Sequence, residues 1–189
     1  MDKEKFSKWK VLDSEYALRR PWLTARKDRV QLPNGVINEE QWVLEYPDWV
    51  NVIAITDDGD VVMEYQYRHG LQQYGYELCA GVVENGEAPL DAAKRELYEE
   101  TGFGGGVWEE YMVISANPST TTNLTHCFVA KGVKRVSTQH LEATEDIEVV
   151  MSTPEEVKQM LLRGDIVQAL MAAPLWRYIS EHGTADWNK

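Results

Sequence analysis

Residues 89–101 form the segment that most constrains the fold, because the sequence marks both ends of a helix there. Pro89 suits the first helical position, and Gly102 is well placed to cap the other end. At about 100° per residue, three apolar residues fall within one narrow sector of this helix: Leu90, Ala93 and Leu97. The segment is therefore predicted to be a helix that packs one apolar stripe against a core.

Three glutamates, Glu96, Glu99 and Glu100, occupy a separate sector of the same helix. Side chains at such spacings lie ~5–6 Å apart, and like charges there cost roughly a few tenths of a kcal/mol per pair. Divalent cations that bridge a diphosphate would offset this repulsion, since Mg²⁺ prefers carboxylate oxygens as ligands. Taken alone, however, the three residues fit a solvated acidic face slightly better than a metal site, so the choice depends on the surrounding sequence.

The remaining sequence is typical of strands before and after this helix, followed by two helices. Strands are predicted at residues 9–19, 22–32, 36–46, 49–56, 61–67, 76–83, 108–116, 123–133 and 147–152. Turn residues separate several of them: Pro33-Asn34-Gly35 and Asp57-Asp58-Gly59. The two helices are expected from Pro154 to about Leu162 and from Ile166 to Glu181.

This order of elements predicts an α+β fold with layered architecture. Residues 49–189 are expected to form the main domain, an α/β/α sandwich. Residues 1–48 are expected to form a small antiparallel β-sheet of their own.

The composition excludes several classes of protein. A net charge of −12 over 189 residues argues against nucleic acid as a partner, because such binding needs a basic surface. No apolar run approaches the ~18 residues of a membrane-spanning helix, and the charged N-terminus leads into no signal region, so a cytoplasmic protein is expected. Cys79 and Cys127 lack metal-ligand spacing and are interpreted as buried thiols. An anionic substrate would be repelled unless bound cations reverse the local field.

A longer pattern surrounds the three glutamates. Gly81 is followed after five residues by Glu87, and after seven more by Arg95-Glu96-Leu97-Tyr98-Glu99-Glu100-Thr101-Gly102-Phe103. This spacing matches every fixed position of the Nudix box, and the chain therefore resembles the Nudix hydrolases. The resemblance implies a Nudix α/β/α sandwich that binds Mg²⁺ or Mn²⁺ and hydrolyses a nucleoside diphosphate linked to another group.

The resemblance also implies roles for residues of the box. Three glutamates become metal ligands by position: Glu96, Glu99 and Glu100. Glu99 would also orient or deprotonate the attacking water, and Arg95 would brace the site by pairing with Glu99. The carbonyl of Ala80 is expected to be a main-chain metal ligand, where Gly81 lets the backbone approach closely. Glu87 is a candidate for the outer shell or for a third ion.

Segments outside the box resemble the ADP-ribose pyrophosphatase branch of the family, which acts on nucleotide sugars. These segments are Gln66-Tyr67-Arg68 and Glu77-Leu78-Cys79-Ala80-Gly81, in which Cys79 stands where relatives usually carry Pro. Pro118 lies sixteen residues after Gly102, close to a marker proline of that branch, whereas Ser119 replaces the usual Gly.

Positions carried over from that branch suggest further site residues. Arg68, Glu77 and Pro118 are expected to contact substrate, with Glu77 as an acceptor for a ribose hydroxyl, while a role for His69 is left open. Glu145 resembles a later carboxylate that lies near the metals and takes part in catalysis, with Glu142 as a possible substitute. The alternative interpretation of that segment is an acidic loop before a strand.

The segment from Arg19 to Arg29 carries a net charge of +4 in a strongly acidic protein, and Trp22 lies within it. Aromatic faces stack on bases, and Arg pairs with phosphates. In the branch that the chain resembles, a similar N-terminal sheet mediates dimerisation, which implies a homodimer with Trp22 and Trp42 among the substrate contacts. A hairpin or interface aromatic explains Trp22 equally well, and the interface is the favoured role of Trp42.

The sequence thus predicts Mg²⁺-dependent hydrolysis of ADP-ribose or a related nucleoside diphosphate sugar to a nucleoside monophosphate and a sugar phosphate. One alternative is a Nudix pyrophosphohydrolase of nucleoside triphosphates or dinucleoside polyphosphates. Another is a non-catalytic nucleotide-binding module that regulates a partner, against which the intact carboxylates argue.

Overall fold

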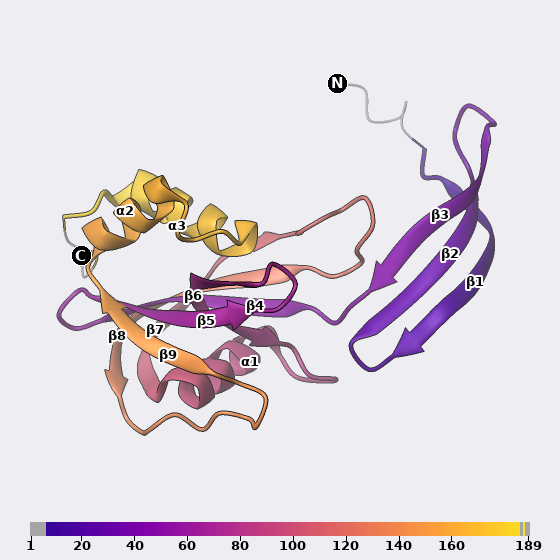
Figure 1. Cartoon of the computed structure of the whole chain (residues 1–189). Coiled ribbons are helices and arrows are strands. Elements are labelled where there is room, and N and C mark those ends of the chain that lie inside the picture. Colours follow the sequence, from indigo (N-terminus) through magenta and orange to yellow (C-terminus); the bar gives the residue numbers. More distant parts are fainter. Residues whose placement is uncertain (1–6, 186, 188–189) are drawn as a thin grey trace. The chain divides into compact units, whose positions relative to one another are not determined.

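The computed structural model describes residues 7–185 and residue 187, and divides into two compact units (Figure 1). The first unit ends at Pro47 and also includes Asn117–Asn123. The second runs from Asp48 to Ala116 and resumes at Leu124. The contribution of residues 117–123 to the first unit was not expected from the sequence.

The N-terminal unit is a three-stranded antiparallel sheet in the order β1 (Lys10–Arg20), β2 (Leu23–Gln31) and β3 (Ile37–Glu45). The turn before β3 contains Gly35 at φ +85°, a backbone conformation that glycine adopts without steric cost. The loop that includes Thr120 and Thr122 is joined to this sheet at Leu44, whose amide donates to the carbonyl of Thr120 at 2.7 Å.

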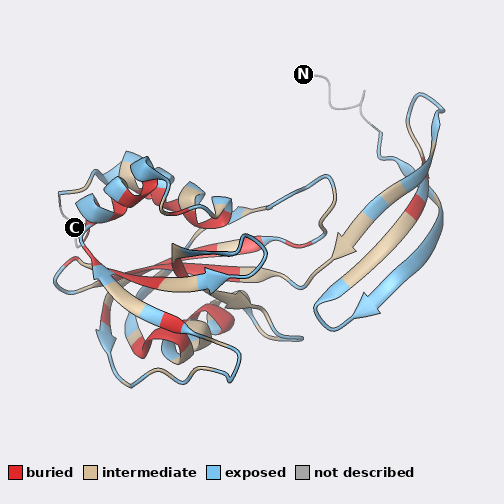
Figure 2. Cartoon of the chain, viewed as in Figure 1, coloured by how far each residue is buried: buried red, intermediate tan, exposed pale blue. Residues whose placement is uncertain are grey.

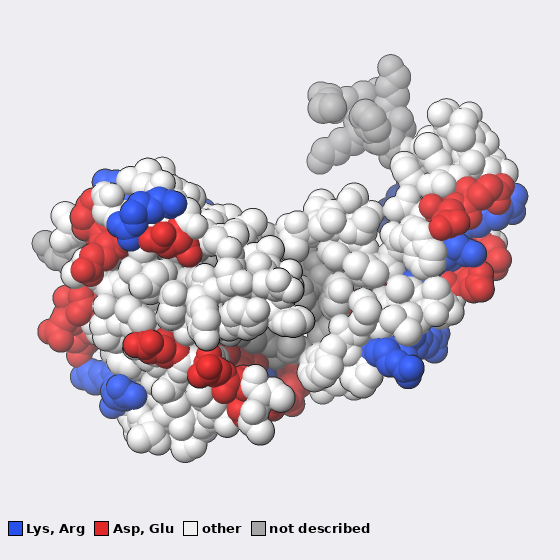
Figure 3. All heavy atoms as spheres, viewed as in Figure 1, with Lys and Arg blue, Asp and Glu red and all other residues white. Residues whose placement is uncertain are grey.

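Three basic side chains of this sheet have acidic partners within it. Arg26 pairs with Asp28 and Glu45, and further pairs join residues of adjacent strands: Lys27 with Glu15, and Arg29 with Glu39. Figure 3 shows the blue and red atoms intermixed over this unit. Much of the local positive charge counted along the sequence is therefore balanced in space.

The second unit is built on a six-stranded mixed sheet in the order β7-β8-β4-β6-β5-β9. Its strands are β4 (Trp49–Thr56), β5 (Val61–Arg68), β6 (Gln73–Val82), β7 (Phe103–Ile114), β8 (Thr125–Arg135) and β9 (Ile147–Ser152). β4 and β8 run parallel, whereas the other pairs are antiparallel. β4 is buried along nearly its whole length, as expected for a strand covered on both faces.

Helices cover both faces of this sheet (Figure 1). Helix α1 (Pro89–Glu96) lies on one face, and α2 (Pro154–Arg163) and α3 (Ala169–His182) lie on the other. Two buried clusters result, one around Val52, Ala93 and Leu97 and one around Ile53 and Leu175 (Figure 2). The predicted α+β fold and α/β/α layering are confirmed. None of the helices in the described part of the chain is long and apolar enough to cross a membrane.

Two helices differ in detail from the sequence prediction. The helix expected through Thr101 changes at Leu97 into a π-helical turn, η2 (Leu97–Thr101). The last helix begins at Ala169 instead of Ile166, because the preceding segment is extended and the carbonyl of Asp165 accepts a hydrogen bond from Tyr76 of β6 at 3.3 Å.

Gly102 ends η2 in the left-handed conformation at φ +73°, and its amide donates a hydrogen bond to the carbonyl of Tyr98 at 2.9 Å. A Cβ at this position would lie 2.4 Å from the main-chain oxygen of Ser137. We therefore expect Gly102→Ala to lower the free energy of unfolding by about 2–4 kcal/mol, since the left-handed penalty adds to a backbone clash.

The matched control is Gly86→Ala, because Gly86 has φ +84° but open space around its Cβ position. This variant should lose only about 1 kcal/mol. Urea unfolding of both variants in chelator measures the difference. Equal losses would show that the Ser137 contact does not constrain the cap.

Candidate active site

The side chain of Glu96 packs directly against the backbone of Gly81 on β6. An ideal Cβ on Gly81 would lie 2.0 Å from both Cδ and Oε1 of Glu96. The backbone of Gly81 is not in the left-handed region, so its missing side chain, rather than its conformation, matters here. The Glu96 carboxylate thus lies where any other residue at position 81 would place its Cβ.

Arg95 connects the carboxylates that precede and follow it. Its guanidinium donates two hydrogen bonds to Glu87, at 3.0 and 2.9 Å, and a third to the carbonyl of Val82 at 3.0 Å. Nη1 lies 2.9 Å from Glu96 and 3.3 Å from Glu99. Arg95 lowers the pKa of Glu87 through these hydrogen bonds. The expected pairing with Glu99 is present, but Glu87 is the better-bonded partner.

The three glutamates of this helical segment differ in how far their side chains are buried. Glu96 and Glu100 are largely buried, whereas Glu99 is half-exposed. Burial raises the pKa of Glu96; Arg95 opposes this shift, while the nearby charges of Glu99 and Glu145 add to it. The π-helical turn carries both Glu99 and Glu100, and such turns are frequent at functional sites.

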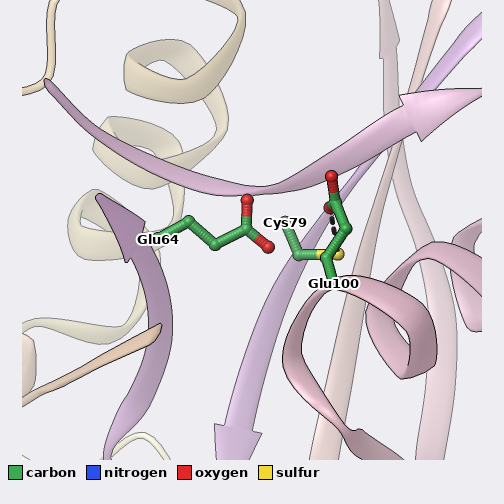
Figure 4. Close-up of side chains that lie close together, drawn as sticks. All are labelled: Glu64, Cys79 and Glu100. Carbon is green, nitrogen blue, oxygen red and sulfur yellow. Dashed lines mark hydrogen bonds between the residues drawn. The ribbon is translucent and has the colours of Figure 1, made fainter. Parts of the chain in front are cut away.

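Glu100 lies in a buried group with Glu64 of β5 and Cys79 of β6, as Figure 4 shows. One carboxylate oxygen of each glutamate and the Cys79 sulfur lie within 4.8 Å of one another. Glu100 accepts hydrogen bonds from the Cys79 thiol and the amide of Ala80, both at 3.2 Å. Burial raises the pKa of Glu100 to about 7 and also raises the pKa of Glu64 and Cys79.

Glu64 was not selected from the sequence. Its Oε1 is buried and has no hydrogen-bond partner among the described residues. The sequence signal was a carboxylate inside the apolar run from Val61, but only the sheet register and the position of η2 bring it beside Glu100. Glu64 adds a buried acidic group to the site.

The loop before β9 is attached to η2. Gln139 donates to the carbonyls of Glu100 at 2.8 Å and Ile147 at 3.0 Å, and the amide of His140 donates to the carbonyl of Glu99 at 2.7 Å. Glu145 of this loop accepts a hydrogen bond from the amide of Glu142 at 2.8 Å. Glu145 is half-buried and Glu142 is exposed, and the catalytic role expected of Glu145 stays a prediction.

Arg68 and Glu77 form a bidentate ion pair across β5 and β6. Nε and Nη2 of Arg68 donate to the two oxygens of Glu77 at 2.9 and 2.6 Å. Glu77 is buried and holds the exposed Arg68 in place, and its expected contact with a ribose hydroxyl stays a prediction. Arg68 also lines a cleft of about 310 Å³ together with Ala80 and Gly81, whereas His69 is exposed nearby.

The other expected substrate contacts belong to the N-terminal unit. Trp22 lies in the turn between β1 and β2 with 73% of its surface exposed. Trp42 lies on β3, where its indole donates to Glu40 at 2.6 Å, and Pro118 lies in the loop that this unit includes. Their contacts with substrate stay predictions.

The donor set of the main unit fits a hard divalent cation. Glu96, Glu99 and Glu100 offer carboxylate oxygens along one helical segment, and Ala80 follows Cys79 beside Glu100. Oxygen donors of this kind suit Mg²⁺ or Mn²⁺. The close approach that Gly81 permits places Glu96 against the same strand.

Comparisons with known proteins agree with this architecture. Residues 46–171 match the model of the NUDIX domain, and residues 9–39 match that of the nucleoside diphosphate sugar hydrolase N-terminal domain. The methanol dehydrogenase activator of Bacillus methanolicus is 35% identical over 71% of this chain and 72% of its own length. The ADP-ribose pyrophosphatase of Bacillus subtilis (strain 168) is 30% identical over 76% of this chain and 77% of its own length.

A solved structure of an ADP compounds hydrolase has the same fold. It superimposes with a TM-score of 0.82, covering 95% of this chain and 98% of that one at 22% identity. The match to the NUDIX domain extends from β4 into α3. It therefore includes the carboxylate helix, which is α1 together with η2, and helices on both faces of the sheet. The chain belongs to the Nudix hydrolases, in the branch of the ADP-ribose pyrophosphatases.

Proposed function

We propose that this enzyme hydrolyses the pyrophosphate bond of ADP-ribose or a related nucleoside diphosphate sugar, with Mg²⁺ or Mn²⁺, to a nucleoside monophosphate and a sugar phosphate. The observation that carries the proposal is the crowding of Glu96, Glu99 and Glu100 along one helical segment beside Gly81. Support also comes from the N-terminal match to nucleoside diphosphate sugar hydrolases and from the relative named an ADP-ribose pyrophosphatase.

The site residues divide into those that hold metal and those that handle water and phosphate. Glu96, Glu99, Glu100 and the carbonyl of Ala80 would hold the cations, with Glu87 in the outer shell. Bound cations supply charge neutralisation at the diphosphate and a lowered pKa of bound water.

Side chains at or near these proposed metal ligands would transfer the proton and bind the phosphates. Glu99, the most exposed of the three glutamates, takes the proton of the attacking water, or Glu145 does so from the loop before β9. Arg95 supports catalysis by holding Glu87, Glu96 and Glu99 in position. Arg68, fixed by Glu77, binds the substrate diphosphate.

We also propose that the N-terminal segment, residues 1–48, mediates the formation of a homodimer. Its exposed apolar side chains include Trp9, Val11, Trp22 and Ile37, which a second copy would cover. Trp22, Trp42 and Pro118 would then contact substrate. Light scattering after gel filtration tests the assembly, and a monomeric mass at micromolar concentration would refute this part.

A panel of nucleotides with product analysis tests the activity. ADP-ribose with Mg²⁺ should yield AMP and ribose 5-phosphate, with release abolished by chelator. Release of inorganic pyrophosphate from deoxynucleoside triphosphates, without turnover of ADP-ribose, GDP-mannose or other ADP-sugars, would favour the triphosphate alternative. Binding without any turnover would favour a regulatory nucleotide-binding module.

A further inference from the structure

One cleft of the main unit is lined by Ala80 and Gly81, which lie against Glu100 and Glu96. It extends along β4 and β6 to the segment that leads into α3, where Gln168 and Leu170 line it. Its volume of about 310 Å³ is at the lower end of the range of ligand sites, roughly 300–1,000 Å³. A group attached to a phosphate that Arg68 and the cations proposed at Ala80 bind would therefore have a cavity next to it that is large enough for one moiety.

Asn51 and Gln168 line this cleft, and each has a side-chain oxygen that lacks a hydrogen-bond donor among the described residues. Asn51 is 0% exposed, and its Nδ2 donates to the carbonyl of Leu170 at 2.8 Å, which fixes Oδ1 as the other end of the amide. Oδ1 of Asn51 and Oε1 of Gln168 are both buried without a partner among residues 7–185 and 187. Buried polar atoms are normally hydrogen-bonded, because leaving one unpaired costs free energy.

The chemistry of these two atoms specifies the missing group. Both are neutral acceptors, so the ligand must supply O–H or N–H donors rather than charge. The remaining walls include apolar side chains such as Trp49, Val50 and Met171, which suit the C–H faces of a ring. A sugar provides neighbouring hydroxyl donors on a ring with apolar faces, and it is attached directly to phosphate in every nucleoside diphosphate sugar.

We propose that this cleft is a sugar subsite, in which Asn51 Oδ1 and Gln168 Oε1 accept hydrogen bonds from sugar hydroxyls and set the sugar preference. The proposal rests on the function proposed above. The bound sugar is either the ribose of the nucleoside or the sugar on the other phosphate, and both present the same hydroxyl chemistry to the two amides.

Gln168 is the residue to change, because it is half-exposed at the start of α3 and makes no side-chain cap to that helix. Gln168→Met keeps the length of the side chain and removes its acceptor. Its neighbour Val167 is exposed and does not line this cleft, so Val167→Ala is the matched control. Calorimetry with a non-hydrolysable α,β-methylene ADP-ribose reports binding independently of turnover.

We expect wild type and Val167→Ala to bind this analogue about three- to tenfold more tightly than Gln168→Met does. Two further analogues lack a hydroxyl, one on the adenosine ribose and one at C2 of the terminal ribose. Wild type should discriminate against one of them by a similar factor, and Gln168→Met should lose that discrimination. The analogue for which discrimination disappears identifies the sugar in the cleft.

The proposal is overturned if wild type does not bind the analogue, if neither missing hydroxyl weakens binding, or if Gln168→Met discriminates as wild type does. Tight, discriminating binding without hydrolysis of ADP-ribose would instead support the subsite and refute the proposed activity. The two failures are therefore distinguishable.

Discussion

Replacing Glu100 by Gln is expected to lower kcat for ADP-ribose hydrolysis by about a hundred- to ten-thousandfold. The substitution removes one charged oxygen ligand from the proposed metal site and keeps the shape of the side chain. The amide oxygen of Gln can still accept the hydrogen bond that the amide of Ala80 now donates to Glu100 at 3.2 Å. The fold around the site should therefore survive, and steady-state kinetics with Mg²⁺ measures the loss.

The same variant should gain stability when metal is absent. Burial raises the pKa of Glu100 in the folded state to about 7, well above the ordinary value of 4.5. A carboxyl group of this kind favours folding below its unfolded pKa, and that contribution is lost as pH rises through the folded pKa. In chelator, Glu100→Gln should therefore match wild type near pH 5 and exceed its free energy of unfolding at pH 8 by on the order of 1–3 kcal/mol.

Glu99→Gln is the control for this stability gain. Glu99 is half-exposed, so its substitution should also lower activity but should change unfolding in chelator by less than about 0.5 kcal/mol. Urea unfolding at pH 5 and pH 8 separates the two variants. If Glu100→Gln unfolds well below wild type in chelator at pH 8, Glu100 is a structural residue and the metal proposal loses its support.

The carboxylate helix was predictable because its signals are local. Pro89 at the start, Gly102 at the end and the apolar stripe depend only on neighbours a few residues away. The π-helical turn was not predictable, since a helical wheel assumes a constant rotation per residue. Within that turn Glu100 is buried, whereas Glu99 is half-exposed.

Features that depend on strand register could not be obtained from one sequence. Glu64 lies beside Glu100 only because β5 pairs with β6 and η2 packs against β6. In the N-terminal sheet, Lys27 and Glu15 are distant in sequence but are direct partners across β1 and β2. A linear count of charge therefore overestimated the basic character of that segment.

Gly81→Ala is expected to lower kcat by about a hundredfold without unfolding the protein. The new Cβ would lie 2.0 Å from Cδ and Oε1 of Glu96, so the carboxylate must move away by more than 1 Å. Displacements of this size at a catalytic group cost on the order of a hundredfold in rate. The clash involves the end of a flexible side chain, and the backbone at Gly81 is one that alanine adopts, so stability in chelator should change little.

The matched control is Gly75→Ala, on the same strand β6. Its Cβ would lie 3.6 Å from the carbonyl oxygen of Asp165, an ordinary van der Waals contact, so activity should be retained. Manganese titration followed by electron paramagnetic resonance should show weaker binding for Gly81→Ala and unchanged binding for Gly75→Ala.

A double substitution tests whether Gly81 acts through Glu96. If the new methyl group lowers the rate by displacing that carboxylate, Glu96→Gln should cost much less activity in the Gly81→Ala background than in wild type, because both changes remove the same ligand. Independent, multiplicative losses would mean that Gly81 has another role. Wild-type activity of Gly81→Ala would show that the Glu96 carboxylate need not occupy this space during the reaction.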